Sequence, residues 1–360
     1  MGVDTKPLFL TKSYHFELPE ELIASEPLQR RDSSRLLVVN RANGSIEHRQ
    51  IGELPAILDS SFTLVANNTK VIRARLLGER VGTGGKVEFF LLKKLSPTRW
   101  QGLMKTGKRV MPGFEFKIHG ILGKVIARED TNAGAIFTAD FSEDPVAARI
   151  GEVPLPPYIQ QKLEASAKLD LSSDRVLEEY NTLFASEEGS VAAPTAGRHF
   201  TPDLIAALAA KGIDWNEITL HVGLGTFKPV MATDLREHTM HAETASVSEV
   251  LAAKLNKAKQ SGRKILSIGT TSTRTLEGFC DQNGVLQSGT RDLDLFIYPG
   301  CERGWRLVDA MITNFHLPES TLLMMISSFI GSRERALEIY AEAIKQKYRF
   351  YSYGDAMLIL

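Results

Sequence analysis

Cysteine is scarce in this sequence, and long apolar segments are missing. The 360 residues include two cysteines, Cys280 and Cys301, which do not show the clustered spacing of a zinc site or a disulfide framework. The longest apolar run, at residues 322–330, is shorter than the roughly 20 residues that a membrane-spanning helix needs. The first residues lack the apolar core and cleavage site of a signal peptide. We therefore expect a cytoplasmic protein that binds no membrane. A monomer is also expected, but not from these features, which leave the oligomeric state open.

An excess of charge of one sign is also absent from the whole chain, but the charge is unevenly distributed. The 43 basic residues balance 43 acidic residues. Between residues 70 and 128, however, fourteen Lys or Arg accompany three Glu, which gives this segment a net charge of +11. A compact basic segment is typical of binding to the phosphate backbone of a nucleic acid. The alternative is a solvated face that only keeps the protein soluble.

Two hydrophobic patterns divide the chain. Short runs rich in β-branched and aromatic residues, separated by Gly, Pro and Asn, occupy residues 71–141 and predict a small β-barrel. This segment begins after residues 67–69 (NNT) and ends at the proline-rich stretch 153–158 (VPLPPY). We therefore predict a basic β-barrel domain at 69–153, inserted into a discontinuous α/β body of residues 1–68 and 154–360.

The second half of the chain alternates strands and helices. Strands are expected at 215–222, 263–268, 293–298 and 307–312, and helices at 203–211, at 247–262, from residue 270 and after residue 320. This alternation predicts an α/β body with a mostly parallel sheet. Ligands of such folds bind at the carboxyl ends of the strands.

Three irregular segments each place a histidine beside Gly, Pro or Thr. They are residues 190–200 (SVAAPTAGRHF), 221–228 (HVGLGTFK) and 314–321 (NFHLPEST). Any one of them alone is explained by a tight turn with a hydrogen-bonded histidine. Three such segments that follow strands or precede helices favour a shared pocket, where a histidine near its ordinary pKa moves protons at neutral pH.

Residues 269–274 (GTTSTR) predict an anion site, because free N–H groups at a helix start can converge with hydroxyls and a guanidinium on a carboxylate or phosphate. The alternative is a plain helix cap. The segment lacks the Gly-Lys-Ser/Thr ending of a P-loop, and the chain has no Gly-x-Gly-x-x-Gly fingerprint after a first strand. Binding of a nucleoside triphosphate or a dinucleotide is therefore disfavoured.

The spacing of His238, His241 and Glu243 is the one pattern that suggests a metal. It lacks the His-Glu-x-x-His arrangement of hydrolytic zinc sites, so substrate binding, proton transfer or a solvated surface explains it better. A serine or cysteine nucleophile is disfavoured because no Gly-x-Ser-x-Gly elbow is present. Two alternatives stay open on the residues alone: a histidine- or metal-dependent hydrolase with a basic substrate-capture domain, and a non-catalytic RNA-binding protein.

A series of ordered motifs along nearly the whole chain resembles one known family, the S-adenosylmethionine:tRNA ribosyltransferase-isomerases of queuosine biosynthesis. Besides the three histidine segments, the motifs are 16–27 (FELPEELIASEP), 31–37 (RDSSRLL), 67–76 (NNTKVIRARL), 84–89 (GGKVEF), 153–159 (VPLPPYI), 238–243 (HTMHAE), 268–277 (IGTTSTRTLE), 294–300 (DLFIYPG) and 348–359 (YRFYSYGDAMLI). Two positions depart from the family pattern: Asn68 stands where Asp is expected, and Arg198 where an apolar residue is common.

The resemblance implies an enzyme that transfers and isomerises the ribosyl part of S-adenosylmethionine onto 7-aminomethyl-7-deazaguanine at the wobble position of tRNA. Epoxyqueuosine-tRNA forms, and adenine and methionine are released. S-adenosylmethionine is consumed as the donor, no cofactor is recycled and no metal is required. The partner is a tRNA that carries 7-aminomethyl-7-deazaguanine in its anticodon. Similar proteins combine an α/β body with an inserted β-barrel.

The resemblance carries the motif positions over without a settled role for each. We assign proton transfer to His199, His221 and His316, with Glu243 as a further candidate. Substrate binding is assigned to small and polar residues of the same motifs: Thr195, Gly197, Gly223, Gly225, Thr226, Gly269, Thr270, Thr271, Ser272, Arg274 and Asn314. Binding of tRNA is assigned to six cations of the basic segment: Arg73, Lys93, Lys94, Lys105, Lys108 and Arg109.

Overall fold

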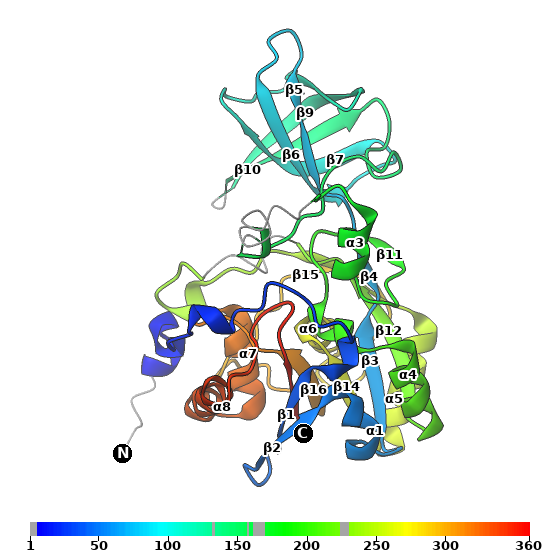
Figure 1. Ribbon diagram of the computed structural model, residues 1–360, viewed down its shortest axis with the longest axis vertical. Helices are drawn as coiled ribbons and strands as arrows, with labels where there is room; N and C mark the ends of the chain where they lie inside the picture. The colour runs from blue at the N-terminus through cyan, green and yellow to red at the C-terminus, as the bar shows by residue number, and fades with distance from the viewer. Residues whose placement is uncertain (1–5, 132–133, 157, 161–169, 224–229) are drawn as a thin grey trace. The chain divides into compact units, whose positions relative to one another are not determined.

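The computed structural model describes residues 6–131, 134–156, 158–160, 170–223 and 230–360 (Figure 1). Within these residues the chain forms two compact units. The first, which we call the body, comprises the described residues up to Asn68, Thr182–Ala185 and Pro194–Leu360. The second, the inserted unit, comprises Thr69–Asn181 and Ser186–Ala193 and so extends beyond residue 153. The division into domains at residues 69 and 153 stays a prediction.

A nine-stranded mixed sheet forms the centre of the body, in the order β15-β13-β12-β3-β14-β16-β17-β1-β2. Its strands are β1 (Arg35–Val39), β2 (Ile46–Gln50), β3 (Phe62–Asn67), β12 (Asp214–Leu220), β13 (Glu243–Val247), β14 (Lys264–Ile268), β15 (Gly289–Leu293), β16 (Ala310–Asn314) and β17 (Ala356–Ile359). The four central strands β12, β3, β14 and β16 are parallel, and so are β17 and β1. The remaining ladders are antiparallel. The predicted fold class, an α/β body with an inserted barrel, is confirmed.

The parallel direction of the central strands brings their last residues to one edge of the sheet, which we call the carboxyl edge. Asn67, Leu220, Ile268 and Asn314 end the four strands. Strand β17 runs antiparallel to β16 and pairs Ala356 with Asn314, so its first residue also lies at this edge. The carboxyl edge is where open parallel sheets bind their ligands.

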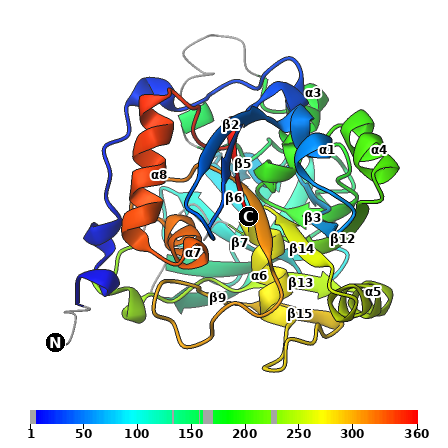
Figure 2. The ribbon, with the colours of Figure 1, turned by 90° about the horizontal axis from the view of Figure 1, so that it is seen from below.

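Short helices cover one face of the sheet. Leu64 of β3 and Leu266 of β14 pack in one buried cluster with Phe200 and Leu204. This cluster also includes residues of η5 (Ile51–Glu53), α1 (Leu54–Ile57), η6 (Thr195–His199) and α4 (Pro202–Ala210). Figure 2 shows α1 and α4 on this side. Alternate residues of a strand point to opposite faces, so the neighbouring residues point to the second helical layer.

The second face contacts longer helices. Ser267 of β14 bonds through its hydroxyl to Thr273 of α6 (Thr270–Phe279), with 2.7 Å between the oxygens. Helices α7 (Thr321–Ile330) and α8 (Arg333–Lys345) pack together on the side of the sheet opposite α1 and α4 (Figure 2). Helix α5 (Glu249–Gln260) contacts β14. The body also contains η1 (Lys6–Phe9), η2 (Thr11–Tyr14), η3 (Glu20–Leu22), η4 (Arg31–Ser33) and η8 (Leu235–Glu237).

Side-chain caps explain where these helices begin. The Ser320 hydroxyl accepts a hydrogen bond from Leu323 N at 3.2 Å and starts α7, as the sequence predicts. Ser248 and Thr201 cap α5 and α4 in the same way. The expected strand at 293–298 is wrong in its position, because β15 ends at Leu293. Ile297 is nevertheless buried, so its hydrophobic pattern reflects packing without a strand ladder.

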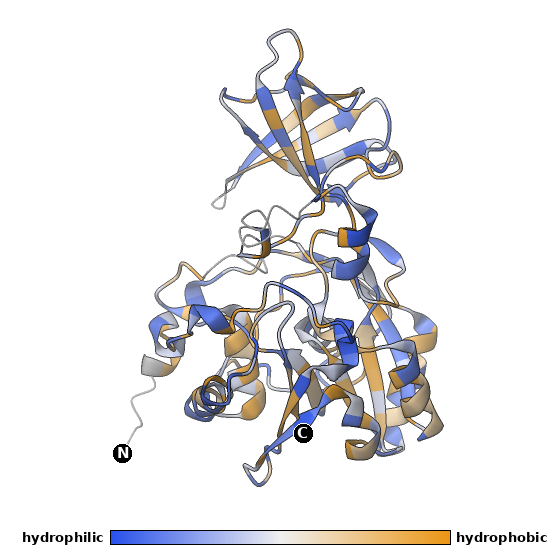
Figure 3. Cartoon of the chain, viewed as in Figure 1, coloured by the Kyte–Doolittle hydropathy of each residue, from blue (hydrophilic) through white to orange (hydrophobic). Residues whose placement is uncertain are grey.

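Six antiparallel strands of the inserted unit close into a barrel, in the order β10-β7-β6-β5-β8-β9. They are β5 (Arg75–Arg80), β6 (Lys86–Lys94), β7 (Arg99–Thr106), β8 (Glu115–Ile118), β9 (Ile121–Thr131) and β10 (Gly134–Phe141). Hydrophobic and hydrophilic residues alternate along them (Figure 3). Phe89, Phe116 and Phe141 fill the interior, with ring centroids 5.5–5.7 Å apart. Trp100 and Phe114 are also buried, so they belong to the core.

Strands β4 (Thr69–Val71) and β11 (Glu187–Ser190) form a parallel pair beside helix α3 (Asp174–Tyr180) in the inserted unit. Arg73 is buried in this unit and binds the Asp174 carboxylate through Nη2 at 2.7 Å. In neither unit is a described helix long and apolar enough to cross a membrane.

Candidate active site

Side chains from several predicted motifs meet at the carboxyl edge of the sheet. Asn314 ends β16, Gly269 follows β14, and His221 follows β12. Glu243 begins β13, which is antiparallel to β12, and so lies at the same edge. The sequence places these residues at the ends of separate elements, and the sheet brings them together.

The side chain of Asn314 joins two residues of η6. Its Oδ1 accepts a hydrogen bond from the Thr195 hydroxyl at 3.0 Å, and its Nδ2 lies 3.2 Å from Nε2 of His199. His199 and Asn314 are buried, with exposed fractions of 5% and 2%, whereas Thr195 is half-buried. Three predicted site residues therefore form one fixed polar cluster.

The environment of His199 keeps its ring neutral. Burial lowers the pKa of His199 to about 4, and the positive charge of Arg198 acts in the same direction. A hydrogen bond to the main chain of Arg31 opposes these effects. Arg198 itself is held internally, with Nη1 donating to the Ser352 carbonyl at 3.1 Å and its guanidinium 4.2 Å from the Tyr353 ring centroid.

The start of α6 lies against η6. Gly269 has φ = 87°, and a Cβ atom on it would lie 3.5 Å from Cβ of Ala196. Gly197 meets Phe184 instead, because an added Cβ would lie 2.8 Å from its ring. The absence of a side chain at Gly197 is thus required by packing, whereas Gly269 supplies a turn that only glycine adopts readily.

Most hydroxyls at the start of α6 are used within the protein. Ser272 donates to the Ile268 carbonyl at 2.7 Å, and the Thr271 hydroxyl accepts from Asn67 Nδ2 at 3.2 Å. The Thr270 side chain is buried, and its hydroxyl forms no hydrogen bond with another described residue. Thr270 and Thr271 lie in the first turn of α6. As at any helix start, their main-chain N–H groups therefore have no carbonyl acceptor inside the helix.

Arg274 and Glu243 form an ion pair that is almost completely shielded from solvent. Arg274 Nη2 binds Glu243 Oε2, and the two side chains are 1% and 3% exposed. Glu243 Oε1 also accepts from the main-chain N of Gly223 at 2.8 Å. Two further nitrogens of the guanidinium, Nε and Nη1, are buried without a hydrogen-bond partner in the described part of the chain. An unpaired buried donor is costly, so these nitrogens suit an acceptor from a ligand.

The other two predicted histidines differ in their surroundings. His316 Nε2 lies 2.8 Å from the Thr313 hydroxyl, its main-chain N donates to Tyr340, and burial lowers the pKa of its ring well below the usual range. His221 is partly exposed, and its main-chain N donates to the Thr244 carbonyl at 2.9 Å. Gly225 and Thr226 lie outside the described residues.

The residues with metal-like spacing do not converge. The His238 ring packs edge-on against Phe296 at 5.2 Å, and Glu243 is engaged by Arg274 and Gly223. In the residues that the structure describes, no cluster of three or more His, Cys, Asp or Glu could hold a metal ion.

The six predicted RNA-contacting cations fall into two groups. Arg73 is buried in its pair with Asp174, and Lys94 binds the Asp144 carboxylate at 2.5 Å. Lys93, Lys105, Lys108 and Arg109 are exposed. Of these, Lys105, Lys108 and Arg109 form no ion pair with any described residue, and all three lie at the end of β7 or directly after it.

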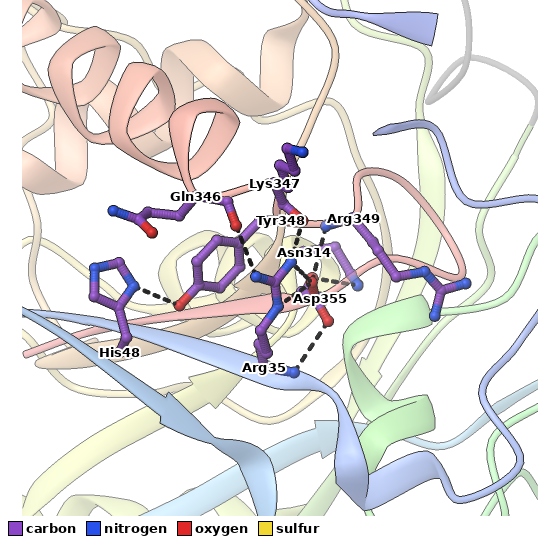
Figure 4. A network of polar contacts seen from close by, with 8 residues as sticks. All are labelled: Arg35, His48, Asn314, Gln346, Lys347, Tyr348, Arg349 and Asp355. Atoms are coloured by element: carbon purple, nitrogen blue, oxygen red, sulfur yellow. Dashed lines mark hydrogen bonds and ion pairs between the residues drawn. The ribbon is translucent and has the colours of Figure 1, made fainter. Parts of the chain in front are cut away.

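Asp355 and Arg35 hold the Asn314 cluster from the side opposite η6, and of these two only Arg35 was left out by sequence reasoning. The carboxylate of Asp355 is buried and binds Arg35, and the Asp355 carbonyl accepts from Asn314 Nδ2 at 3.2 Å (Figure 4). Both residues stand in quoted motifs, 31–37 and 348–359, but the two positions are 320 residues apart in sequence. No local pattern signals their contact.

Glu277, the last residue of motif 268–277, has a structural role. It is fully buried, and its carboxylate accepts from the main-chain N of Arg306, Leu307 and Val308 at 2.9–3.3 Å. These bonds fasten the segment before β16 to α6. The motif therefore combines residues of the candidate site with one that holds the helix in place.

Comparisons with known proteins agree with this architecture. A family model described as queuosine biosynthesis protein matches residues 11–359. The S-adenosylmethionine:tRNA ribosyltransferase-isomerases of Acetivibrio thermocellus and Symbiobacterium thermophilum are 44% and 46% identical, and each alignment covers 96% of this chain and 98% of the relative. A crystal structure of the S-adenosylmethionine tRNA ribosyltransferase from Thermotoga maritima is 33% identical, has a TM-score of 0.52, and is matched over 96% of this chain and 99% of that one. The chain belongs to the queuosine biosynthesis protein family and is a transferase of this family.

Proposed function

We propose that the protein transfers and isomerises the ribosyl moiety of S-adenosylmethionine onto 7-aminomethyl-7-deazaguanine at the wobble position of tRNA. The products are epoxyqueuosine-tRNA, adenine and methionine. S-adenosylmethionine is consumed, and neither a recycled cofactor nor a metal takes part. The observation that carries this proposal is the gathering of Thr195, His199 and Asn314 beside Gly269 at the carboxyl edge of the sheet.

The start of α6 is the proposed site for the carboxylate of the methionine part of S-adenosylmethionine. First-turn N–H groups and the positive end of the helix dipole stabilise an anion there. The residues proposed to bind are Gly269, Thr270, Thr271 and Ser272, with Ser272 acting through its main chain because its hydroxyl donates to Ile268. Arg274 lies one turn further along and offers Nε and Nη1 to a second acceptor of the substrate.

Proton transfer is proposed for the three histidines. The sulfonium of S-adenosylmethionine acidifies the adjacent ribose carbon, so one base starts the elimination, and an acid that protonates adenine assists its departure. Burial keeps His199 and His316 neutral at neutral pH, so each ring has one nitrogen with a lone pair, and the lowered pKa makes that nitrogen a weaker base. To accept a proton from the substrate, Nε2 of His199 has to exchange its bond with Asn314 Nδ2. Glu243 is the further candidate, although its pairing with Arg274 favours a role in fixing the guanidinium.

The remaining proposed contacts of the substrate come from small or polar residues of the same segments. Thr195 and Asn314 orient polar groups of the nucleoside, and Gly197 and Gly223 shape the main chain beside them. Gly225 and Thr226, which lie outside the described residues, are also proposed to bind the substrate.

The barrel is proposed to bind the anticodon arm of tRNA. Lys105, Lys108 and Arg109 are the strongest candidates because they are exposed and form no ion pair with described residues. Lys93 is exposed on β6 and is a fourth candidate. Arg73 and Lys94 would have to exchange their carboxylate partners to bind phosphate, so we expect smaller contributions from them.

The test is to incubate the protein with S-adenosylmethionine and a tRNA bearing 7-aminomethyl-7-deazaguanine, and then to analyse digested tRNA and free small molecules by mass spectrometry. The proposal expects epoxyqueuosine in the tRNA with one adenine and one methionine released for each nucleoside formed. The same tRNA with guanine at the wobble position is the control and should yield none of the three. Release of adenine without a new nucleoside would contradict the proposal.

A further inference from the structure

A buried clasp lies behind the Asn314 cluster and contributes none of the residues assigned above to the substrate. Asp355 is 2% exposed, and its carboxylate receives hydrogen bonds from two chain segments. Arg35 donates its main-chain N to Oδ1 at 3.0 Å and its Nη2 to Oδ2 at 3.1 Å, and the main-chain N of Arg349 donates to Oδ2 at 2.8 Å (Figure 4). The clasp thereby ties the start of β1 to the segment that leads into β17.

Arg35 also closes the turn that precedes Asp355. Its Nη1 donates to the Gln346 carbonyl at 2.8 Å, its Nη2 to the Lys347 carbonyl, and its guanidinium lies 4.2 Å from the Tyr348 ring centroid. Lys347 and Tyr351 have φ values of 56° and 72°, in the left-handed region that residues with a side chain rarely adopt. The contacts of Arg35 and Asp355 hold this unfavourable turn in place.

The clasp fixes the main-chain carbonyl of Asp355, and this carbonyl fixes the amide of Asn314. A carbonyl only accepts, so the group 3.2 Å from it must be the amide nitrogen Nδ2 of Asn314. The amide oxygen then faces the Thr195 hydroxyl at 3.0 Å. The orientation of the amide, which atom positions alone leave open, follows from these two partners.

The orientation of the amide determines the tautomer of His199. Asn314 Nδ2 is only a donor, so Nε2 of His199 at 3.2 Å must accept and carries no proton. The ring proton is left on Nδ1, and the His199 ring also forms a hydrogen bond with the main chain of Arg31. The hydrogen bond to one ring nitrogen thus decides the state of the other.

We propose that Arg35 and Asp355 are positioning residues that act through Asn314 to hold His199 as its Nδ1–H tautomer in the candidate active site. The kinetic part of this inference rests on the proposed function, whereas the tautomer is a property of the protein alone. Neither residue touches the reacting atoms. Loss of the clasp moves the Asp355 carbonyl, frees the Asn314 amide to turn over and lets the ring adopt either tautomer.

The test compares Asp355→Asn and Arg35→Lys with the unmodified protein by two measurements. Histidine labelled with nitrogen-15 reports which ring nitrogen of His199 is protonated, and a spectrum of His199→Gln identifies its signals. Steady-state kinetics with S-adenosylmethionine and tRNA report kcat and KM. We expect His199 to be protonated at Nδ1 in the unmodified protein and to show mixed tautomers in both variants. Misplacement of this kind should lower kcat about 10- to 100-fold with KM within about two-fold.

A matched control lies at the other end of β16. Asp309 pairs with Lys259 at 2.8 Å and accepts a hydrogen bond from the main-chain N of Ile265 at 2.7 Å. Like Asp355, it is a carboxylate that binds both a cationic side chain and a main-chain N, but it lies at the opposite end of β16 from Asn314. Asp309→Asn should leave both the tautomer and kcat unchanged. Circular dichroism and thermal unfolding establish which variants fold, and Asp355→Glu replaces Asp355→Asn if the latter does not.

Each outcome decides the proposal. Mixed tautomers in the clasp variants, but not in Asp309→Asn, support the proposal. They support it even if the unmodified protein transfers no ribosyl group, because that result would refute only the proposed function. A His199 signal that stays Nδ1–H in folded clasp variants overturns it, even if kcat falls, because the effect would then arise elsewhere. Protonation at Nε2 in the unmodified protein overturns it as well.

Discussion

At the scale of single residues, His199 shows how burial defines a candidate catalytic group. Its ring is buried and lies within hydrogen-bond distance of Asn314, and the positive charge of the neighbouring Arg198 lowers its pKa further. The sequence indicates Thr195, His199 and Asn314 because each stands in an irregular segment next to an ordered element. Their mutual contacts, and the clasp behind them, depend on strand pairing between distant segments, which no local pattern contains.

The neutral state of His199 predicts a specific dependence of stability on pH. Burial lowers the pKa of His199 to about 4 in the folded protein, below the ordinary value of about 6.5 in the unfolded chain. The unfolded chain therefore binds the proton first as pH falls, and stability is lost between about pH 6.5 and 4 and retained in full above that window. Between pH 7 and 5, the free energy of unfolding should fall by about 2 kcal/mol more in the unmodified protein than in His199→Asn.

Denaturant unfolding at pH 7, 6 and 5, followed by tryptophan fluorescence and circular dichroism, measures this difference. His316 has a lowered pKa as well, but it is present in both proteins and cancels in the comparison. Parallel pH dependence of the two proteins would show that His199 titrates normally.

The buried pair of Arg274 and Glu243 predicts a large loss of stability when one charge is removed. The side chains are 1% and 3% exposed, so Glu243→Gln leaves a guanidinium without a counter-charge in the interior. We expect a decrease in the free energy of unfolding of about 3–5 kcal/mol. Glu338→Gln breaks the pair of Glu338 with Arg335, whose side chains are 63% and 35% exposed, and should cost less than about 1 kcal/mol. Equal losses in the two variants, measured by denaturant unfolding, would contradict this account.

At the scale of elements, α6 contains both the proposed anion site, at its start, and the residue that holds the helix in place, Glu277. Gly269 at its start has φ = 87° and ψ = 154°, and Glu277 near its end binds three main-chain N–H groups. The strand-to-helix transition could be predicted because a buried strand ends in glycine followed by a helical pattern. The position of β15 could not be predicted from the sequence. Buried residues at 293–298 give the hydrophobic pattern of a strand, although the residues after Leu293 pair with no neighbouring strand.

Gly269→Ala tests how the start of α6 is built. A side-chain-bearing residue at these dihedral angles is strained by about 1–3 kcal/mol, so the variant should lose that much stability and bind S-adenosylmethionine more weakly. Equilibrium dialysis with S-adenosylmethionine and denaturant unfolding measure the two effects. Gly52→Ala is the control, because its φ is ordinary and its nearest neighbour would lie 3.5 Å from the added Cβ. Unchanged affinity in Gly269→Ala would remove the helix start from the proposed site.

At the scale of the whole molecule, the charge pattern and the strand pattern single out the same segment. The barrel could be predicted because its alternation and its charge both differ from the rest of the chain. The sequence could not predict which cations are already paired with carboxylates, because ion pairs such as Lys94 with Asp144 join residues 50 positions apart. Of the six predicted cations, Lys105, Lys108 and Arg109 are exposed, form no ion pair with a described residue and lie at or directly after the end of β7.

This group predicts a change in the salt dependence of tRNA binding. Reversal of Lys105, Lys108 and Arg109 to Glu should weaken binding and reduce the slope of log affinity against log salt by about three, or about one for each lost phosphate contact. Reversal of Lys211, Lys254 and Lys257, which are exposed on the body, is the matched control and should leave the slope nearly unchanged. Fluorescence anisotropy with labelled tRNA between low and moderate salt measures both. If the two triple variants behave alike, the residues after β7 are not the footprint.

The fate of the ribosyl group tests the proposed reaction most directly. S-adenosylmethionine is prepared in three forms, labelled in the ribose, in the adenine or in the methyl group, and each is incubated with the protein and tRNA bearing 7-aminomethyl-7-deazaguanine. The account predicts that only the ribose label enters the tRNA, while the adenine label is recovered as free adenine and the methyl label as methionine. Methyl label in the tRNA, or ribose label that stays in small molecules, would contradict it.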